Sequence, residues 1–228
     1  MKLLTKEELI WSPVVANNAM NRERGVTGVN SYCKELKFNC LQFLEERVIF
    51  AHEPVRWVDL CCGKGRALTD AHRYFQKKTM QSLELEGWDL IDSFHDYDLD
   101  FPKVTWHVGS LEDWTSDYRY DLITCVHGLH YVGDKLSVIE KCVRSLTDDG
   151  VFIANIDFGN VKSLKDKQLK RKVIKICRDH GLTYNPKIKV LRCEGKKDLR
   201  FNLAYQGADD QAGPNYTGQP VVDSYYAS

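Results

Sequence analysis

The chain has 228 residues, enough for one well-packed domain, and its 32 Lys and Arg balance 32 Asp and Glu, so the formal net charge is zero. The net charge therefore creates no electrostatic attraction for nucleic acid or an anionic membrane, and we do not expect nucleic acid as a partner. Residues 1–15 carry charges where a signal peptide needs a continuous apolar core, and no run approaches membrane-spanning length. We expect a cytoplasmic protein without a membrane partner.

The distribution of polar and apolar segments predicts one domain with three parts. Residues 1–50 contain a polar stretch and then a helix that Asn39 is expected to cap, which we interpret as a helical arm or lid. Residues 51–206 form the predicted core. Residues 207–228 form a tail rich in Gly, Pro, Asp and Tyr, which is either a substrate lid or a disordered end.

Five short apolar runs, alternating with helix-like segments, predict five strands in the core. They cover residues 56–60, 82–90, 103–109, 120–128 and 150–158. Continuous apolar character in several of them indicates a parallel sheet that is covered on both faces. Between the last two strands, an apolar stripe that starts at Leu136 predicts a helix ending at Gly150.

The segment after the fifth strand predicts one more helix and a hairpin. Ser163 and Asp166 stand in capping-box positions before a lysine-rich helix, whose charges form a solvated face or, less simply, a docking surface. Residues 187–207 alternate on both sides of a Glu-Gly-Lys-Lys turn, as a hairpin does. The predicted fold class is therefore α/β: a Rossmann-like doubly wound sheet with mainly parallel strands and a C-terminal antiparallel hairpin.

Eight cysteines are scattered at positions 33, 40, 61, 62, 125, 142, 177 and 193, with no C-x-x-C spacing. Most have apolar neighbours, as small buried side chains do in a reducing compartment. We therefore predict free cysteines and no metal site.

A glycine loop follows the first predicted strand and marks the candidate ligand site. Gly63 and Gly65 lie between this strand and a helix, and Asp89 ends the second strand at the spacing where an acid reaches ribose hydroxyls. This arrangement fits a dinucleotide or S-adenosylmethionine. Asp59 would repel a pyrophosphate but attract an ammonium group, and Leu68 occupies the third glycine position of dinucleotide sites, so S-adenosylmethionine is favoured.

The segment from Asp59 to Gly65 resembles the first motif of class I S-adenosylmethionine-dependent methyltransferases, and the similarity extends over about residues 56–158. The flanking segments resemble those of small bacterial methyltransferases of unassigned substrate. The resemblance implies S-adenosyl-L-methionine as the cofactor and S-adenosyl-L-homocysteine as the product. It also implies these cofactor contacts: Asp59, Cys61, Gly63 and Gly65 at the methionine end, Asp89 and Leu90 at the ribose, Ser110 and Leu111 along the adenine, and His127 after the fourth strand.

The sequence departs from this family in three places. Ser110 replaces an acid that accepts from the adenine amino group in many relatives. Residues 90–102 leave little room for the usual helix between the second and third strands. The Asn-Pro-Pro-Tyr-like motif of relatives that methylate nucleobase or glutamine amino groups is absent, which disfavours a nucleic-acid acceptor.

Methyl transfer needs a base only when the acceptor arrives protonated. His127 and His130, on the loop after the fourth strand, are the candidates. The alternative for both is a packing or cofactor-side residue. For His130 this alternative is favoured over a general base, and for His127 the two interpretations have equal weight. We interpret Cys61 and Cys62 as small loop-lining residues rather than nucleophiles.

The two flanking segments supply the remaining candidates. Arg24 is a candidate for contact with the cofactor carboxylate and Tyr32 for a lid over the methionine end, and the alternative is an ordinary exposed segment. The candidate walls of the acceptor pocket are Tyr131, Asn215, Tyr216 and Tyr225.

The sequence thus predicts an S-adenosylmethionine-dependent methyltransferase acting on oxygen, nitrogen or carbon of a small-molecule acceptor. A protein or RNA methyltransferase and a non-catalytic S-adenosylmethionine-binding module are the alternatives. The acceptor and the oligomeric state stay open.

Overall fold

Seven strands form the central sheet of the computed structural model, which describes residues 2–16, 23–78, 82–94 and 103–227. The strands are β1 (Val55–Leu60), β2 (Leu83–Asp89), β3 (Val104–Val108), β4 (Tyr120–Cys125), β5 (Leu146–Asn155), β7 (Leu182–Asn185) and β8 (Val190–Glu194). Their order is β3-β2-β1-β4-β5-β8-β7, with β1 to β5 parallel and β8 antiparallel to both neighbours. The predicted Rossmann-like sheet is confirmed, and its strand order reverses between β1 and β4.

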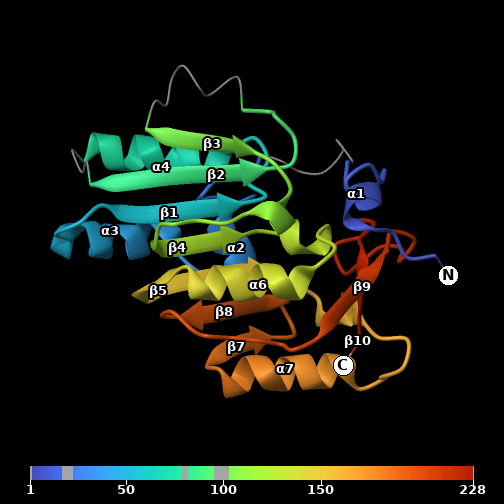
Figure 1. Ribbon diagram of the computed structural model, residues 1–228. Coiled ribbons are helices and arrows are strands. Elements are labelled where there is room, and N and C mark those ends of the chain that lie inside the picture. The colour runs from blue at the N-terminus through green and yellow to red at the C-terminus, as the bar shows by residue number, and fades with distance from the viewer. Residues whose placement is uncertain (1, 17–22, 79–81, 95–102, 228) are drawn as a thin grey trace.

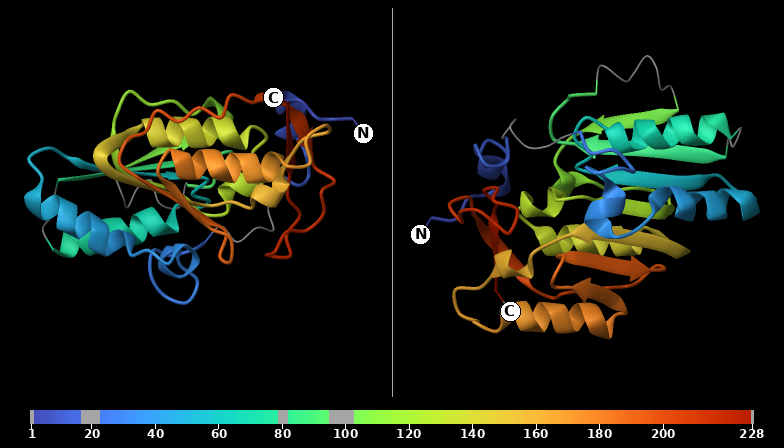
Figure 2. Two further views of the ribbon diagram at one scale, coloured as in Figure 1. Left: turned by 90° about the horizontal axis from the view of Figure 1, so that it is seen from below. Right: turned by 180° about the vertical axis from the view of Figure 1, so that it is seen from behind.

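Helices cover both faces of this sheet (Figures 1 and 2). The four long ones are α3 (Cys40–Phe50), α4 (Arg66–Lys77), α6 (Lys135–Arg144) and α7 (Leu169–Asp179). α3 and α4 pack on one face, and α6 and α7 on the other (Figure 2). The predicted cap of α3 is confirmed, because the side chain of Asn39 accepts a hydrogen bond from the N–H of Gln42. Because helices cover both faces of the sheet, the central strands are apolar along their length.

A second, three-stranded sheet lies beyond the carboxyl ends of β1 to β4 (Figure 1). Its order is β6 (Val161–Lys162), β10 (Asp223–Ala227) and β9 (Ala204–Asp209). Leu4, which precedes α1 (Lys6–Leu9), forms an antiparallel bridge with Ala208 of β9. Segments from near the two ends of the chain therefore lie side by side beyond the carboxyl ends of the central strands (Figure 1). β9 includes residues on both sides of the predicted boundary at residue 206.

The two predicted helices after β4 are shorter than expected. α6 ends at Arg144 instead of Gly150, because residues 146–149 already belong to β5. α7 begins at Leu169, and the Ser163 hydroxyl instead accepts from the backbone of two following residues in a turn. Both errors arise where polar residues stand between two elements and the local pattern does not show which element they join.

The antiparallel hairpin was predicted at the wrong place. β8 pairs with β7, which precedes it, while β9 joins the second sheet. After Glu194 the chain turns at Gly195, whose φ is +70°, and crosses the core so that Leu199 and Phe201 are buried. The alternating pattern of this segment therefore reflects burial against the core and not strand pairing.

Other predictions concern single residues and short segments. All eight cysteines are free, and six of them are buried, as predicted. Among the described residues, no three His, Cys, Asp or Glu side chains lie together as metal ligands would. Within the same ranges, no helix combines the length and the apolar character needed to cross a membrane. The shortened helix expected over 90–102 falls largely on residues 95–102, which lie outside the described residues.

Candidate active site

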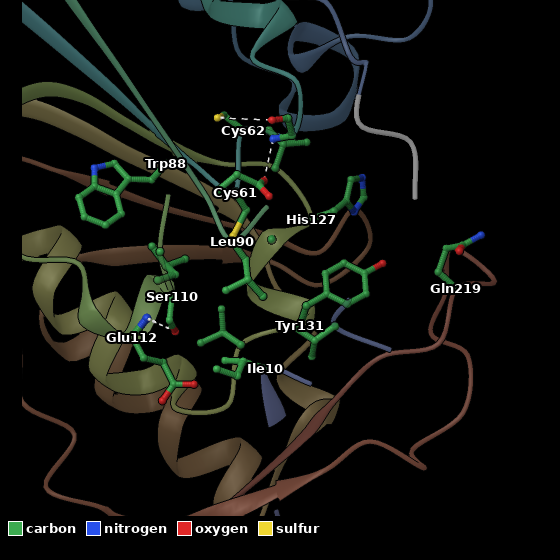
Figure 3. A pocket seen from close by; sticks show the side chains of 18 of the residues that line it. Ile10, Cys61, Cys62, Trp88, Leu90, Ser110, Glu112, His127, Tyr131 and Gln219 are labelled. Atoms are coloured by element: carbon green, nitrogen blue, oxygen red, sulfur yellow. Dashed lines mark hydrogen bonds between the residues drawn. The ribbon is translucent and has the colours of Figure 1, made fainter. Parts of the chain in front are cut away.

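A pocket of about 260 Å³ lies at the carboxyl ends of β1, β2, β3 and β4, beside the point where the strand order reverses. Figure 3 shows Trp88 and Ser110 at one end of it and His127 and Gln219 at the other. Ten predicted residues line it: Arg24, Tyr32, Cys61, Gly63, Asp89, Leu90, Ser110, Leu111, His127 and Tyr131. The sequence motifs thus converge on one site.

The glycine loop owes its shape to backbone conformations that favour glycine. Gly63 and Gly65 have φ values of +62° and +78°, and a Cβ on Gly65 would stand 2.2 Å from the Trp106 ring. Gly65 precedes α4 as its N-cap and does not line the pocket, so the structure shows a role in shaping the loop, and its cofactor contact stays a prediction. Cys61 adopts φ +59° and lines the pocket, which fits the interpretation as a loop-lining residue.

Asp89 ties the glycine loop to the end of β2. One carboxylate oxygen accepts from the N–H of Gly63 at 2.8 Å, and the other accepts from the N–H of Ile91 at 3.1 Å. Asp89 itself lines the pocket. On the next strand, Ser110 lines the pocket and its hydroxyl accepts from the N–H of Glu112 at 3.3 Å.

Asp59 does not line the pocket but is fully buried behind Tyr32. Its two oxygens accept hydrogen bonds from the Tyr32 hydroxyl and the Thr124 hydroxyl, both at 2.6 Å. Burial raises the pKa of Asp59 to about 7, against the opposing effect of these hydrogen bonds. In the structure Asp59 holds Tyr32, and Tyr32 lines the pocket; a direct contact of Asp59 with the cofactor stays a prediction.

His127 lines the pocket just after β4 and is 9% exposed. Its Nε2 lies 3.1 Å from Oε2 of Glu35 on α2 (Tyr32–Leu36), and Oε1 of Glu35 lies 3.5 Å from Nε of Arg24. The contact with His127 is the main cause that lowers the pKa of Glu35, so this carboxylate stays charged. Sequence reasoning missed Glu35, because nothing in its local pattern marks a contact 92 residues away.

His130 lies outside the pocket wall, in contrast to its predicted catalytic role. It is 1% exposed, and burial together with nearby His127 and Lys135 lowers its pKa to about 3. Its Nε2 lies 3.4 Å from the hydroxyl of Tyr216. A neutral, enclosed imidazole fits the packing alternative.

The tail contributes to the pocket through residues other than those predicted. Thr217 and Gln219 line it, whereas Asn215, Tyr216 and Tyr225 do not. Asn215 accepts from Thr217 within a turn, Tyr216 contacts the two histidines, and Tyr225 belongs to β10. Residues 2–16, for which the sequence predicted no site residue, add Leu9, Ile10 and Val15.

These features define an α/β protein with a ligand pocket at the topological switch point of its sheet. A family model described as a methyltransferase domain matches residues 30–182. The chain therefore belongs to this methyltransferase family, as the resemblance of its glycine loop predicted.

Solved structures with similarity to the chain include three methyltransferases. The DszA carbon methyltransferase is 20% identical, with a TM-score of 0.45, over 51% of this chain and 33% of that chain. The plantazolicin methyltransferase BpumL, in complex with a triazolic desmethylPZN analogue and SAH, is 16% identical, with a TM-score of 0.40, over 50% and 43%. SAM-bound CalS10, an amino pentose methyltransferase from Micromonospora echinaspora, is 19% identical, with a TM-score of 0.38, over 50% and 48%. These matches span less than half of each of those proteins, and no curated protein matches the chain.

Proposed function

We propose that this protein is an S-adenosylmethionine-dependent methyltransferase that acts on a small-molecule acceptor. One observation carries the proposal: the glycine loop, the acid that ends β2 and the segment after β3 form adjacent walls of a single pocket. When bound, S-adenosylmethionine supplies an electrophilic methyl group. The chain supplies the binding groups and excludes water.

The residues of the pocket fit this cofactor. Asp89 is placed to accept from ribose hydroxyls, since its oxygens are held at the loop by Gly63 and Ile91. Ser110, Leu111, Tyr32 and Arg24 all line this pocket, and we assign the first two to the adenine and the last two to the methionine end. The arrangement does not favour a dinucleotide. Leu68, which occupies the third glycine position of dinucleotide sites, packs against Gly87 of β2.

The walls contributed by the two chain ends favour a small acceptor. Leu9, Ile10 and Val15 supply apolar surface from the N-terminal segment, and Thr217 and Gln219 supply polar groups from the C-terminal one. Both segments contribute to the pocket wall, and the two chain ends are joined through the bridge between Leu4 and Ala208, which favours a small acceptor over a protein or RNA.

Calorimetric titration of cofactor-free protein with S-adenosylhomocysteine, with NAD as the comparison ligand, tests the cofactor assignment. We expect micromolar binding of S-adenosylhomocysteine alone. Asp89→Ala should weaken it by roughly 10- to 100-fold, the range for a lost hydrogen bond to a charged group. Asp117→Ala, at an exposed position, is the matched control. Binding of NAD alone, or unchanged affinity in Asp89→Ala, would overturn the assignment.

A further inference from the structure

His127 has two properties that a packing role does not explain. Its backbone is left-handed, with φ +61°, a conformation that costs a histidine about 1 kcal/mol or more and that concentrates at functional sites. Its ring is nine-tenths buried in the pocket wall, and Nδ1 has no hydrogen-bond partner among the described residues. An unpartnered buried imidazole nitrogen at a ligand pocket points to a group that arrives with the ligand.

Glu35 fixes which nitrogen of His127 is available. Its carboxylate lies 3.1 Å from Nε2, although neither ring nitrogen forms a hydrogen bond that meets the usual geometry among the described residues. Such contacts are often loose before substrate binds and tighten in the complex. When Nε2 carries the proton and faces Glu35, Nδ1 presents its lone pair.

The position of Glu35 is itself fixed from two sides. α2 is a single helical turn whose first residue, Tyr32, is anchored by the hydrogen bond to buried Asp59. Arg24 lies 3.5 Å from the other oxygen of Glu35 and helps to lower its pKa. The carboxylate is therefore charged, and it is able to stabilise an imidazolium on the adjacent ring.

We infer that His127 is the general base of the proposed methyl transfer and that Glu35 is its positioning residue. This inference rests on the proposed function and narrows its acceptor to a molecule whose nucleophilic oxygen or nitrogen still carries a proton. The acceptor heteroatom loses its proton to Nδ1 of His127 while it forms its bond to the methyl group. The electron pair of the broken carbon–sulfur bond stays on sulfur, which becomes neutral as the imidazole becomes an imidazolium.

Sinefungin is the probe that tests this geometry without the acceptor. This analogue carries an ammonium group on carbon where S-adenosylmethionine carries the methyl group on sulfur. Its N–H groups donate to a base that faces the transferred methyl group, directly or through one water at the acceptor position. S-adenosylhomocysteine lacks this group, so the ratio of the two dissociation constants isolates the contact.

Calorimetry on the full chain measures this ratio in the wild type, in His127→Asn and in Glu35→Gln. Asparagine tolerates the left-handed backbone, and glutamine keeps the shape of Glu35 without its charge. We expect each variant to lower the preference for sinefungin by about tenfold, as for a lost charge-assisted hydrogen bond, with little change for S-adenosylhomocysteine. His52→Asn and Glu46→Gln, at exposed positions, should keep the wild-type ratio.

An unchanged ratio in variants that still bind S-adenosylhomocysteine overturns the inference. Failure of the wild type to bind S-adenosylhomocysteine overturns the proposed function instead. A crystal structure of the wild type with sinefungin gives a second, independent measurement. It supports the inference if the amine contacts Nδ1 of His127 directly or through one water, and it overturns the inference if the amine faces another group.

Discussion

Asp59 makes the stability of this protein depend on pH in a direction opposite to that of an ordinary carboxyl group. Burial raises its pKa from 3.8 to about 7, whereas the unfolded chain keeps the lower value. Between these pH values the folded state retains a proton that the unfolded state has lost. Stability therefore falls as the pH rises through this window, and the full shift corresponds at ~1.4 kcal/mol per pKa unit to an upper bound of about 4 kcal/mol.

Asp59→Asn removes this titration and leaves a side chain of similar shape. Urea unfolding of both proteins at about pH 5 and about pH 8 measures the effect, and the wild type should lose up to about 3 kcal/mol relative to the variant. Any fixed cost of the substitution cancels, because it is present at both pH values. Asp198→Asn, at a side chain that is 87% exposed, should follow the wild type.

Parallel pH dependence of the wild type and Asp59→Asn would refute this reasoning. It would mean that Asp59 is ionised in the fold at both pH values. The hydrogen bonds from Tyr32 and Thr124 would then outweigh the cost of burying the charge, whereas a raised pKa requires that cost to be the larger of the two.

Three further substitutions, at a loop glycine, a buried lysine and a pocket glutamine, give independent tests. Gly65→Ala should cost about 1–3 kcal/mol more in urea unfolding than Gly218→Ala, because both have φ +78° but only the former meets the Trp106 ring; equal costs would contradict the contact. Burial lowers the pKa of Lys135 from 10.5 to about 7, so the unfolded chain binds the extra proton between these values and stability should rise with pH there. Lys135→Met should lose that rise in the same unfolding assay, and persistence of the rise would assign it to another group. Gln219→Ala should leave the S-adenosylhomocysteine affinity unchanged within about threefold, since we place it at the acceptor end; a larger loss would move it to the cofactor.

The central sheet and its glycine loop were predictable because their signals are local. Five apolar runs between turn residues predicted the parallel strands, and the spacing from Asp59 to Gly65 predicted the loop. The hairpin was misplaced because alternation within 187–207 has two physical causes, strand pairing and burial of Leu199 and Phe201 against the core. An alternating apolar pattern indicates which side chains are buried, but it does not indicate which strand or core surface they pack against.

The buried position of Asp59 behind Tyr32 was not predicted, for a related reason. Its charge argued for a direct contact with the ammonium group of a cofactor, yet the apolar run around it predicted burial on both faces of the strand. Burial prevailed because Tyr32 and Thr124 satisfy both oxygens. Only the tertiary structure brings Tyr32 across 27 residues to this carboxylate.

The same hydrogen bond connects the stability of the core to the chemistry of the pocket. Tyr32 and Glu35 stand three residues apart on the one turn of α2, so the anchor at Asp59 also sets where the carboxylate of Glu35 meets His127. A local change at Asp59 thus reaches the pocket through a single helical turn, although Asp59 does not itself line the pocket. The first motif of the chain therefore serves the site twice: its loop faces the pocket, and its buried acid orients the segment that carries Glu35.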